Sequence, residues 1–135
     1  MTFALIFIFI LSACNGDMSN KKDDSKAEQK LEQTRNELVQ EQQELKKELT
    51  DAIDDFNKKI DQFKENLKNK GEELDEASQK TLDDLEQKRD ELQENLNELH
   101  RKTQENWNDF KIQVDQQVQK FKKEAGDFFN KPDKE

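Results

Sequence analysis

Apolar residues recur every eleven positions along a long, highly charged segment, and this spacing constrains the fold more than any other feature. From residue 27 to residue 129 there is no proline and there are only two glycines, while strong helix formers such as Glu, Gln, Lys and Leu dominate. Eleven residues make three helical turns of about 3.67 residues each, so residues at this spacing share one helix face. The longest row is Ala52, Phe63, Leu74, Leu85, Leu96, Trp107, Val118 and Phe129, and a shorter row is Leu92, Thr103, Val114 and Ala125. The pattern predicts helix with a narrow apolar stripe.

The composition limits what this stripe can build. Only 30% of the residues are hydrophobic, 41% are charged, and the net charge is −9. Ordinary globular domains contain about 45–50% apolar residues. The chain therefore lacks the material for a broad core or for a compact enzyme with a buried pocket. A helix with one apolar stripe needs another helix or a lipid surface to cover it.

Gly71 decides between two helical architectures. Asn69-Lys70-Gly71 is typical of a helix that ends before a left-handed glycine, and acidic residues suited to the start of a new helix follow. The sequence therefore predicts an all-α fold, a long antiparallel two-helix hairpin with coiled-coil-like packing, with helices over 27–69 and 73–129 and a tail over 130–135. The alternative is one unbroken helix, because the row through Phe63, Leu74 and Leu85 keeps step across Gly71. Such a rod would have to oligomerise.

Fifteen residues are predicted to line the interface between the helices; we call them the predicted stripe. They are Leu45, Leu49, Phe56, Ile60, Phe63, Leu74, Leu85, Leu92, Leu96, Leu99, Trp107, Phe110, Val114, Val118 and Phe121.

The first residues of the chain form a separate unit. Residues 3–11 are an unbroken apolar run, too short to span a bilayer, which takes about 20 residues, and typical of the apolar region of a signal peptide. Leu11-Ser12-Ala13-Cys14 follows, and it resembles the lipobox of bacterial lipoproteins. The resemblance implies that the signal peptide, residues 1–13, is cut between Ala13 and Cys14 and that the Cys14 sulfur carries a diacylglyceryl group. The alternative is an ordinary signal peptide or short anchor with an incidental cysteine. No Lys or Arg precedes the apolar run, which departs from the basic start of signal peptides.

Residues 14–26 are polar, contain Gly, Ser and Asn, and have no apolar period, so they predict a flexible tether behind the lipidated cysteine. Asn15, rather than Asp, follows the cysteine, and by the lipoprotein resemblance this favours the outer membrane if the cell has one. Two or more acyl chains are enough for stable membrane anchoring.

The body resembles a second family. The residues concerned are Lys88-Arg89-Asp90-Glu91-Leu92-x-x-x-Leu96-x-x-Leu99, Trp107-x-x-Phe110-Lys111 and Val118-x-x-Phe121-Lys122. Over about residues 28–129 the chain is similar to small bacterial coiled-coil proteins linked to stress response, first known from cyanobacteria. The lipobox and the tether lie outside this resemblance. The eleven-residue period also resembles that of apolipoprotein-type lipid-binding helices, and neither family implies a catalytic residue.

The sequence offers no pattern for catalysis or for a cofactor. Cys14 and His100 are the only residues of their types, so a zinc site or a nucleophilic dyad has no partners, and no glycine-rich phosphate loop is present. The net charge of −9 and the lack of a basic stripe disfavour nucleic acid as a partner. No small-molecule substrate is evident.

Aromatic residues gather near the C-terminus of the chain. They are Trp107, Phe110, Phe121, Phe128 and Phe129, and they either dock on lipid or a partner or pack on the first helix. The sequence thus predicts a lipid-anchored, non-enzymatic helical protein of the bacterial envelope, held in the membrane through Cys14, with self-association or another envelope protein as its partner and a stress-related role implied by resemblance. The alternatives are an apolipoprotein-like lipid-binding protein and, more weakly, an oligomeric rod that spans the envelope.

Overall fold

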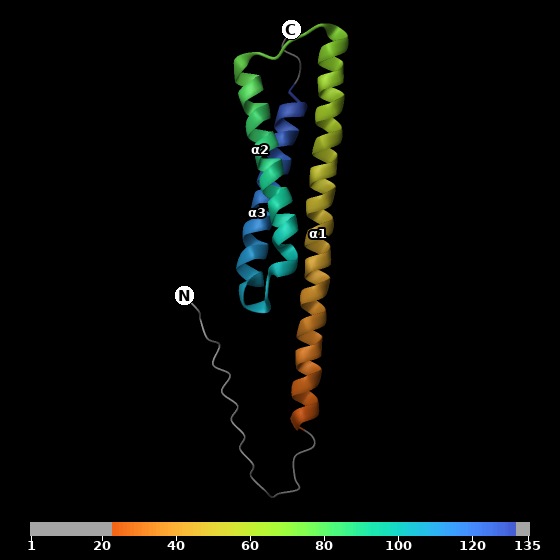
Figure 1. The fold of residues 1–135 in the computed structure, drawn as a ribbon, viewed down its shortest axis with the longest axis vertical. Helices are drawn as coiled ribbons and strands as arrows, with labels where there is room; N and C mark the ends of the chain where they lie inside the picture. Colours follow the sequence, from red (N-terminus) through yellow and green to blue (C-terminus); the bar gives the residue numbers. More distant parts are fainter. Residues whose placement is uncertain (1–22, 132–135) are drawn as a thin grey trace, which may run out of the picture.

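The computed structural model describes residues 23–131, and every regular element in this range is helical. α1 comprises Asp23–Lys70, α2 Glu76–Glu98 and α3 Gln104–Phe129, with a short 3₁₀ helix, η1, at Leu99–Arg101. Each of the three long helices contacts the other two (Figure 1). The predictions for the signal peptide, for Cys14 and for the tether up to residue 22 lie outside the described residues.

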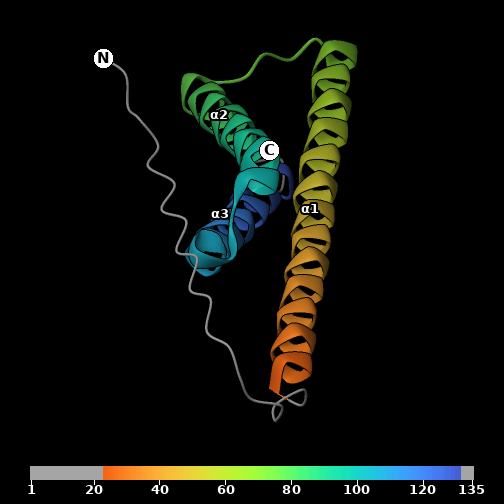
Figure 2. The ribbon, with the colours of Figure 1, turned by 60° about the horizontal axis from the view of Figure 1, so that its bottom comes forward.

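The helices differ in length by a factor of about two. α1 has 48 residues, whereas α2 has 23 and α3 has 26. The chain runs along α1, folds back after Gly71, follows α2, and reverses again at η1 into α3 (Figure 1). Figure 2 shows α1 as one uninterrupted helix that continues past both shorter helices. The first turns of α1 therefore project beyond the region where three helices pack together. α1 also begins four residues before the predicted helix start at residue 27.

The prediction of a second helix over 73–129 is wrong, because the chain leaves the helical path between α2 and α3. Lys102 and Thr103 are extended, with ψ angles of 128° and 168°. The backbone N–H of Thr103 donates a hydrogen bond to Asn106 Oδ1 at 2.9 Å, which satisfies a free donor at the start of α3. Thr103 stands at an apolar position of an eleven-residue row, and its polar side chain is better suited to a helix cap than to a core. A single unbroken rod is excluded by the same fold, since the chain turns back twice.

The connection between α1 and α2 contains the residue predicted for the turn. Gly71 has a φ angle of 66°, the left-handed conformation that glycine adopts without steric cost. The backbone N–H of Glu72 donates to the Leu67 carbonyl at 3.0 Å across this turn. Asp75 then caps α2, because Oδ1 of its side chain accepts a hydrogen bond from the Ser78 backbone N–H at 2.6 Å. Hydrogen bonding by the Ser78 side chain, and then by its backbone N–H, lowers the pKa of the Asp75 carboxyl.

The core lies along the shared axis of the three helices. Twelve of the fifteen residues of the predicted stripe are buried, and the other three, Phe63, Leu74 and Leu96, are partly buried against them. Sequence reasoning left five further buried residues out of the stripe: Ala52, Ile53, Leu82, Ala125 and Phe128. Ala52 and Ala125 stand in the eleven-residue rows but were not counted among the fifteen. The other three widen the buried face, because a helix that faces two partners buries more of its surface than a helix in a two-helix hairpin. Within the described range, no buried side-chain nitrogen or oxygen lacks a hydrogen-bond partner.

Candidate functional site

The aromatic residues of the C-terminal segment point into the bundle. Phe121 packs on Phe56 of α1 with ring centroids 5.0 Å apart, and Phe128 packs edge-on against Phe63 at 5.3 Å. Phe129 approaches Phe56 and Phe63, each at 5.8 Å. These rings form the core at the end of the bundle near the α1–α2 turn. They therefore serve packing on α1, the second of the two roles that the sequence allowed.

Trp107 marks the opposite end of the bundle. Its indole ring is 5% exposed, and its Nε1–H donates a hydrogen bond of 2.5 Å to Glu41 Oε2 on α1. Lys111 Nζ lies 3.7 Å from the other oxygen of the same carboxylate. Gln42 Nε2 donates to the Lys102 carbonyl at 3.4 Å, so the α2–α3 connection meets α1 at the same level. Along α1 toward its N-terminus, Glu41 and Gln42 are the last polar residues whose side chains bond to α3 or to the α2–α3 connection.

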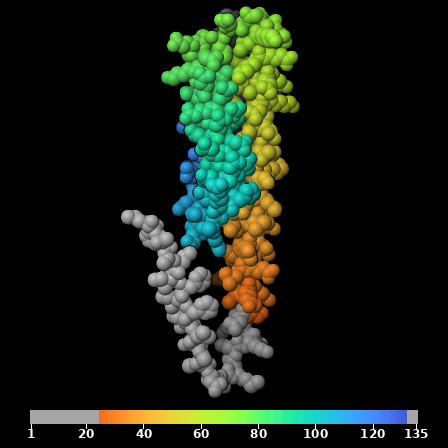
Figure 3. Space-filling view, in the orientation of Figure 1, coloured from red at the N-terminus to blue at the C-terminus, as the bar shows by residue number. Residues whose placement is uncertain are grey.

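The N-terminal part of α1 beyond this level is not enclosed by α2 and α3. We call residues 25–40 the α1 extension. Leu31 is 70% exposed and Val39 is 46% exposed, whereas Leu38 is partly buried at the edge of the core. Figure 3 shows this end of α1 projecting beyond the body formed by the other two helices. Because α2 and α3 leave most of this surface uncovered, the extension is the first candidate for a functional contact.

Charged side chains bridge the helices around the core. Glu48 of α1 binds two residues of α3, Lys122 at 2.9 Å and Gln119 at 3.1 Å. Lys64 of α1 pairs with Glu86 of α2 at 3.0 Å. Lys88 of α2 and Glu124 of α3 form a further ion pair. Partly exposed pairs of this kind contribute little stability each, but they restrict which helix faces can meet.

One carboxyl group among these charged residues, that of Asp115, is disfavoured in its charged form. Burial raises the pKa of the Asp115 carboxyl, the nearby negative charge of Glu48 raises it further, and the ammonium group of Lys111 opposes the change. Asp115 is partly buried on α3 and faces the α1 side of the bundle.

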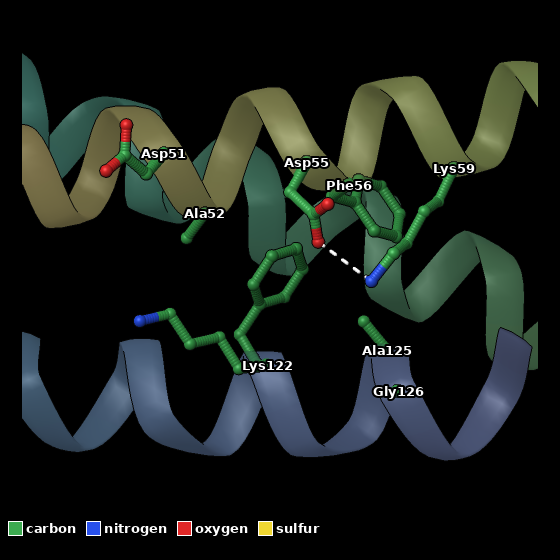
Figure 4. Close-up of a pocket in the computed structure, with 9 residues that line it drawn as sticks. Asp51, Ala52, Asp55, Phe56, Lys59, Lys122, Ala125 and Gly126 are labelled. Carbon is green, nitrogen blue, oxygen red and sulfur yellow. Dashed lines mark ion pairs between the residues drawn. The ribbon is translucent and has the colours of Figure 1, made fainter. Parts of the chain in front are cut away.

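A groove of about 220 Å³ lies between α1 and α3 (Figure 4). Phe56 and the small residues Ala52, Ala125 and Gly126 form its apolar lining. Its rim carries charges that already have partners, because Asp55 pairs with Lys59 at 2.8 Å and Lys122 pairs with Glu48. The groove combines a shallow apolar surface with neutralised charges, which suits packing against a side chain better than chemistry on a substrate.

His100 is exposed in η1, next to the α2–α3 connection. Across residues 23–131, no cluster of His, Cys, Asp and Glu is placed to hold a metal ion. In the same range no helix has both the length and the apolar content needed to cross a membrane.

Comparisons with protein-family models, with curated proteins and with solved structures found no match to this chain.

Proposed function

We propose that this chain is a lipid-anchored, non-enzymatic helical protein of the bacterial cell envelope with a structural or interaction role. One observation carries the proposal: Leu11-Ser12-Ala13-Cys14 directly follows the apolar run of residues 3–11. Small residues at positions 12 and 13 allow a peptidase to approach the backbone before the cysteine. Lipid on the new N-terminal cysteine would then hold the protein at a membrane, since two acyl chains give stable anchoring.

The packing of the helical body supports a membrane anchor that is separate from the helices. Most of its aromatic and leucine side chains pack α1, α2 and α3 against one another. The surface of the bundle is rich in charge, so a separate anchor is the simpler means of membrane attachment. Eight residues separate Cys14 from Asp23, the first residue of α1. A chain of that length reaches at most about 30 Å, so the start of α1 would stay close to the membrane.

An interaction role fits the surface better than catalysis does. The groove between α1 and α3 is lined by ion pairs and apolar side chains, and the charged residues at the helix interfaces are engaged in holding the helices together. A long helix that extends beyond its own bundle offers a surface for another protein. A role in stress response rests on the resemblance of the body alone.

Metabolic labelling with a fatty acid tests the anchor. The full chain is expressed in a bacterium in three forms: wild type, Cys14→Ser, and Ser12→Ala as the matched control that keeps a small residue in the lipobox. We expect label on the wild type and on Ser12→Ala and none on Cys14→Ser. An unlabelled wild-type protein that is nevertheless cleaved would show an ordinary signal peptide instead. Label that persists on Cys14→Ser would contradict lipidation at this cysteine.

Vesicle binding tests the apolipoprotein-like alternative. Because Trp107 is buried against α1, lipid could reach it only if α3 left the bundle. Under our proposal the emission of Trp107 and the helical circular dichroism signal stay unchanged when anionic vesicles are added. A shift of Trp107 emission to shorter wavelength that depends on vesicle concentration would favour the alternative.

A further inference from the structure

The apolar face of α1 continues into the α1 extension, where the described chain leaves most of it uncovered and only Leu38 packs partly against the core. Ala27, Leu31, Thr34 and Leu38 follow one another at spacings of three and four residues and lead into Leu45 of the core. Residues with this spacing share one face of a helix. Leu31 is 70% exposed on this face, while Leu45 is 3% exposed two heptads along the same helix. The extension therefore presents half of a helix–helix interface.

Some charges of the α1 extension repel one another within one helix, although Glu32 and Arg35 stand at a favourable spacing of three residues. Lys26 and Lys30 are four residues apart, and so are Glu28 and Glu32. Like charges at this spacing destabilise a helix. None of the charged residues of the extension forms an ion pair within the part of the chain that the structure describes, although ion pairs link α1 to its neighbours farther along.

We infer that the α1 extension pairs, antiparallel, with the α1 extension of a second copy of this chain. In the register that places Leu31 opposite Thr34 of the other copy, Leu38 lies opposite Ala27. Both large residues then pack against small ones. Coiled-coil geometry then brings the residues that flank the apolar face together. Lys30 lies near Glu37 of the other copy, and Glu28 lies near Arg35, so two-fold symmetry produces four attractive contacts.

Parallel pairing does not achieve this. In a parallel pair, a residue beside the apolar face meets the residue five positions later on the other helix. Lys30 would then face Arg35 of the second copy, which places like charges together. The charge pattern of the extension therefore distinguishes the two orientations and favours the antiparallel one.

The length of the extension also fits this arrangement. In the proposed register, the beginning of α1 in one copy reaches the level of Gln42 in the other. Gln42 binds the Lys102 carbonyl, so the α2–α3 connection begins to cover α1 at that level. Two helical segments of 16 residues form less contact than a standard stable interface of about 1,200–2,000 Å². We therefore expect a weak, reversible dimer, and this pairing does not require that Cys14 be lipidated.

Photo-crosslinking of the full chain in intact cells tests the pairing. A photoreactive phenylalanine derivative replaces Ala27, which is exposed on the apolar face, or Gln43, which is exposed within the bundle and serves as the control position. We expect a product of twice the chain mass from position 27 only. After trypsin digestion, position 27 should be joined to the peptide Asn36–Lys46 of the second copy. Crosslinking to Ala27–Lys30 instead would indicate parallel pairing, and a product formed only with a different protein, or no dimer product, would overturn the proposal.

Charge reversal provides the matched test. Lys30→Glu should lower the crosslinked fraction about tenfold or more, because attraction to Glu37 becomes repulsion at two symmetric places. The double variant Lys30→Glu/Glu37→Lys should restore the crosslink to within about twofold of the wild type. Lys46→Glu, at an exposed position of α1 within the bundle, should leave it unchanged. Circular dichroism checks that all variants keep their helices. An unaffected Lys30→Glu variant, or a double variant that does not recover, would contradict the proposal.

Discussion

Two stretches of α1 carry the same apolar pattern but lie in different surroundings. Along residues 41–63 the apolar face is covered by α2 and α3, and Leu49 is completely buried at 0% exposure. Along residues 25–40 the described chain covers this face only at Leu38, at the edge of the core, and Leu31 is 70% exposed. The helix itself runs without interruption through both stretches. The periodic pattern of a helix therefore indicates which of its faces is apolar and needs a partner. The lengths of the neighbouring helices decide how far along the helix that face is covered.

Truncation of one leucine in each stretch should give the largest difference. Leu49→Ala leaves a cavity in a closed core, and we expect it to lower the free energy of unfolding by about 2–5 kcal/mol. Leu31→Ala, the matched control in the same helix, should change it by less than about 0.5 kcal/mol in dilute solution. Chemical denaturation followed by circular dichroism measures both. Equal losses of unfolding free energy would show that Leu31 is covered even in a single copy of the chain.

Hydrogen exchange should resolve the same boundary residue by residue. Backbone amides of the α1 extension should exchange at least about 100-fold faster than those near Leu49 and Phe56, because few buried contacts oppose local opening. Mass spectrometry of the intact and digested chain measures this at low protein concentration. A higher concentration should slow exchange in the extension alone if two copies pair there. Uniform protection along α1 at every concentration would remove the distinction between the two stretches.

The hydrogen bond at the boundary should have a smaller effect. Trp107→Phe removes the donor to Glu41, and we expect a loss of about 1–2 kcal/mol of unfolding free energy, because the acceptor is charged and only partly solvated. Glu41→Ala and the double variant complete a mutant cycle that isolates the interaction between the two side chains. A coupling energy near zero would mean that α3 is held at this end by apolar packing alone.

The smallest predicted effect is a pH dependence confined to the covered stretch. The folded-state pKa of Asp115 is raised above its ordinary value of 3.8, so folding is favoured while this group is protonated and loses that contribution as pH rises through the raised pKa. Asp115→Asn should therefore raise the melting temperature near neutral pH and have little effect near pH 3. Thermal unfolding at the two pH values measures the difference. A gain that is the same at both values would contradict the assigned cause.

Asp75 has the opposite effect on how stability depends on pH. Its pKa is lowered by the hydrogen bonds to Ser78, so its contribution to stability is present above its ordinary pKa of 3.8 and is lost as pH falls through the lower folded-state value. Acid should therefore weaken the α1–α2 turn while Asp115 becomes less unfavourable. The two aspartates separate the effects of a helix cap from those of a helix interface.

The turn at Gly71 and the break at Thr103 show what sequence reasoning could detect. A glycine after Asn69-Lys70 is a specific stop signal, and the structure has a left-handed residue there. The second break contains neither glycine nor proline, and its only mark is the polar Thr103 at an apolar position of an eleven-residue row. A helix without glycine or proline breaks only where burial of apolar side chains contributes more free energy than the lost helical hydrogen bonds. This balance depends on distant segments, so the local sequence pattern does not reveal it.

The core shows the same limit. A two-helix interface would use a narrow stripe, and the predicted stripe indeed lies in the interior. Ile53, Leu82 and Phe128 are buried as well, so the buried face is wider than the predicted stripe. The candidate site was not predictable at all, because the α1 extension becomes an open surface only when α2 and α3 end before α1 does.

The sequence by itself determined that the described chain is helical, which faces are apolar, and that the first helix ends at Gly71, since these properties depend on residues close together along the chain. It also supplied the lipobox-like motif at Cys14, which the described residues do not include. Only the tertiary structure decided that there are three helices, that the aromatic residues of α3 face inward, and that residues 25–40 extend past the bundle. The physical reason is that burial is a property of contacts between distant segments, and their relative lengths and crossing points are set when the helices pack together.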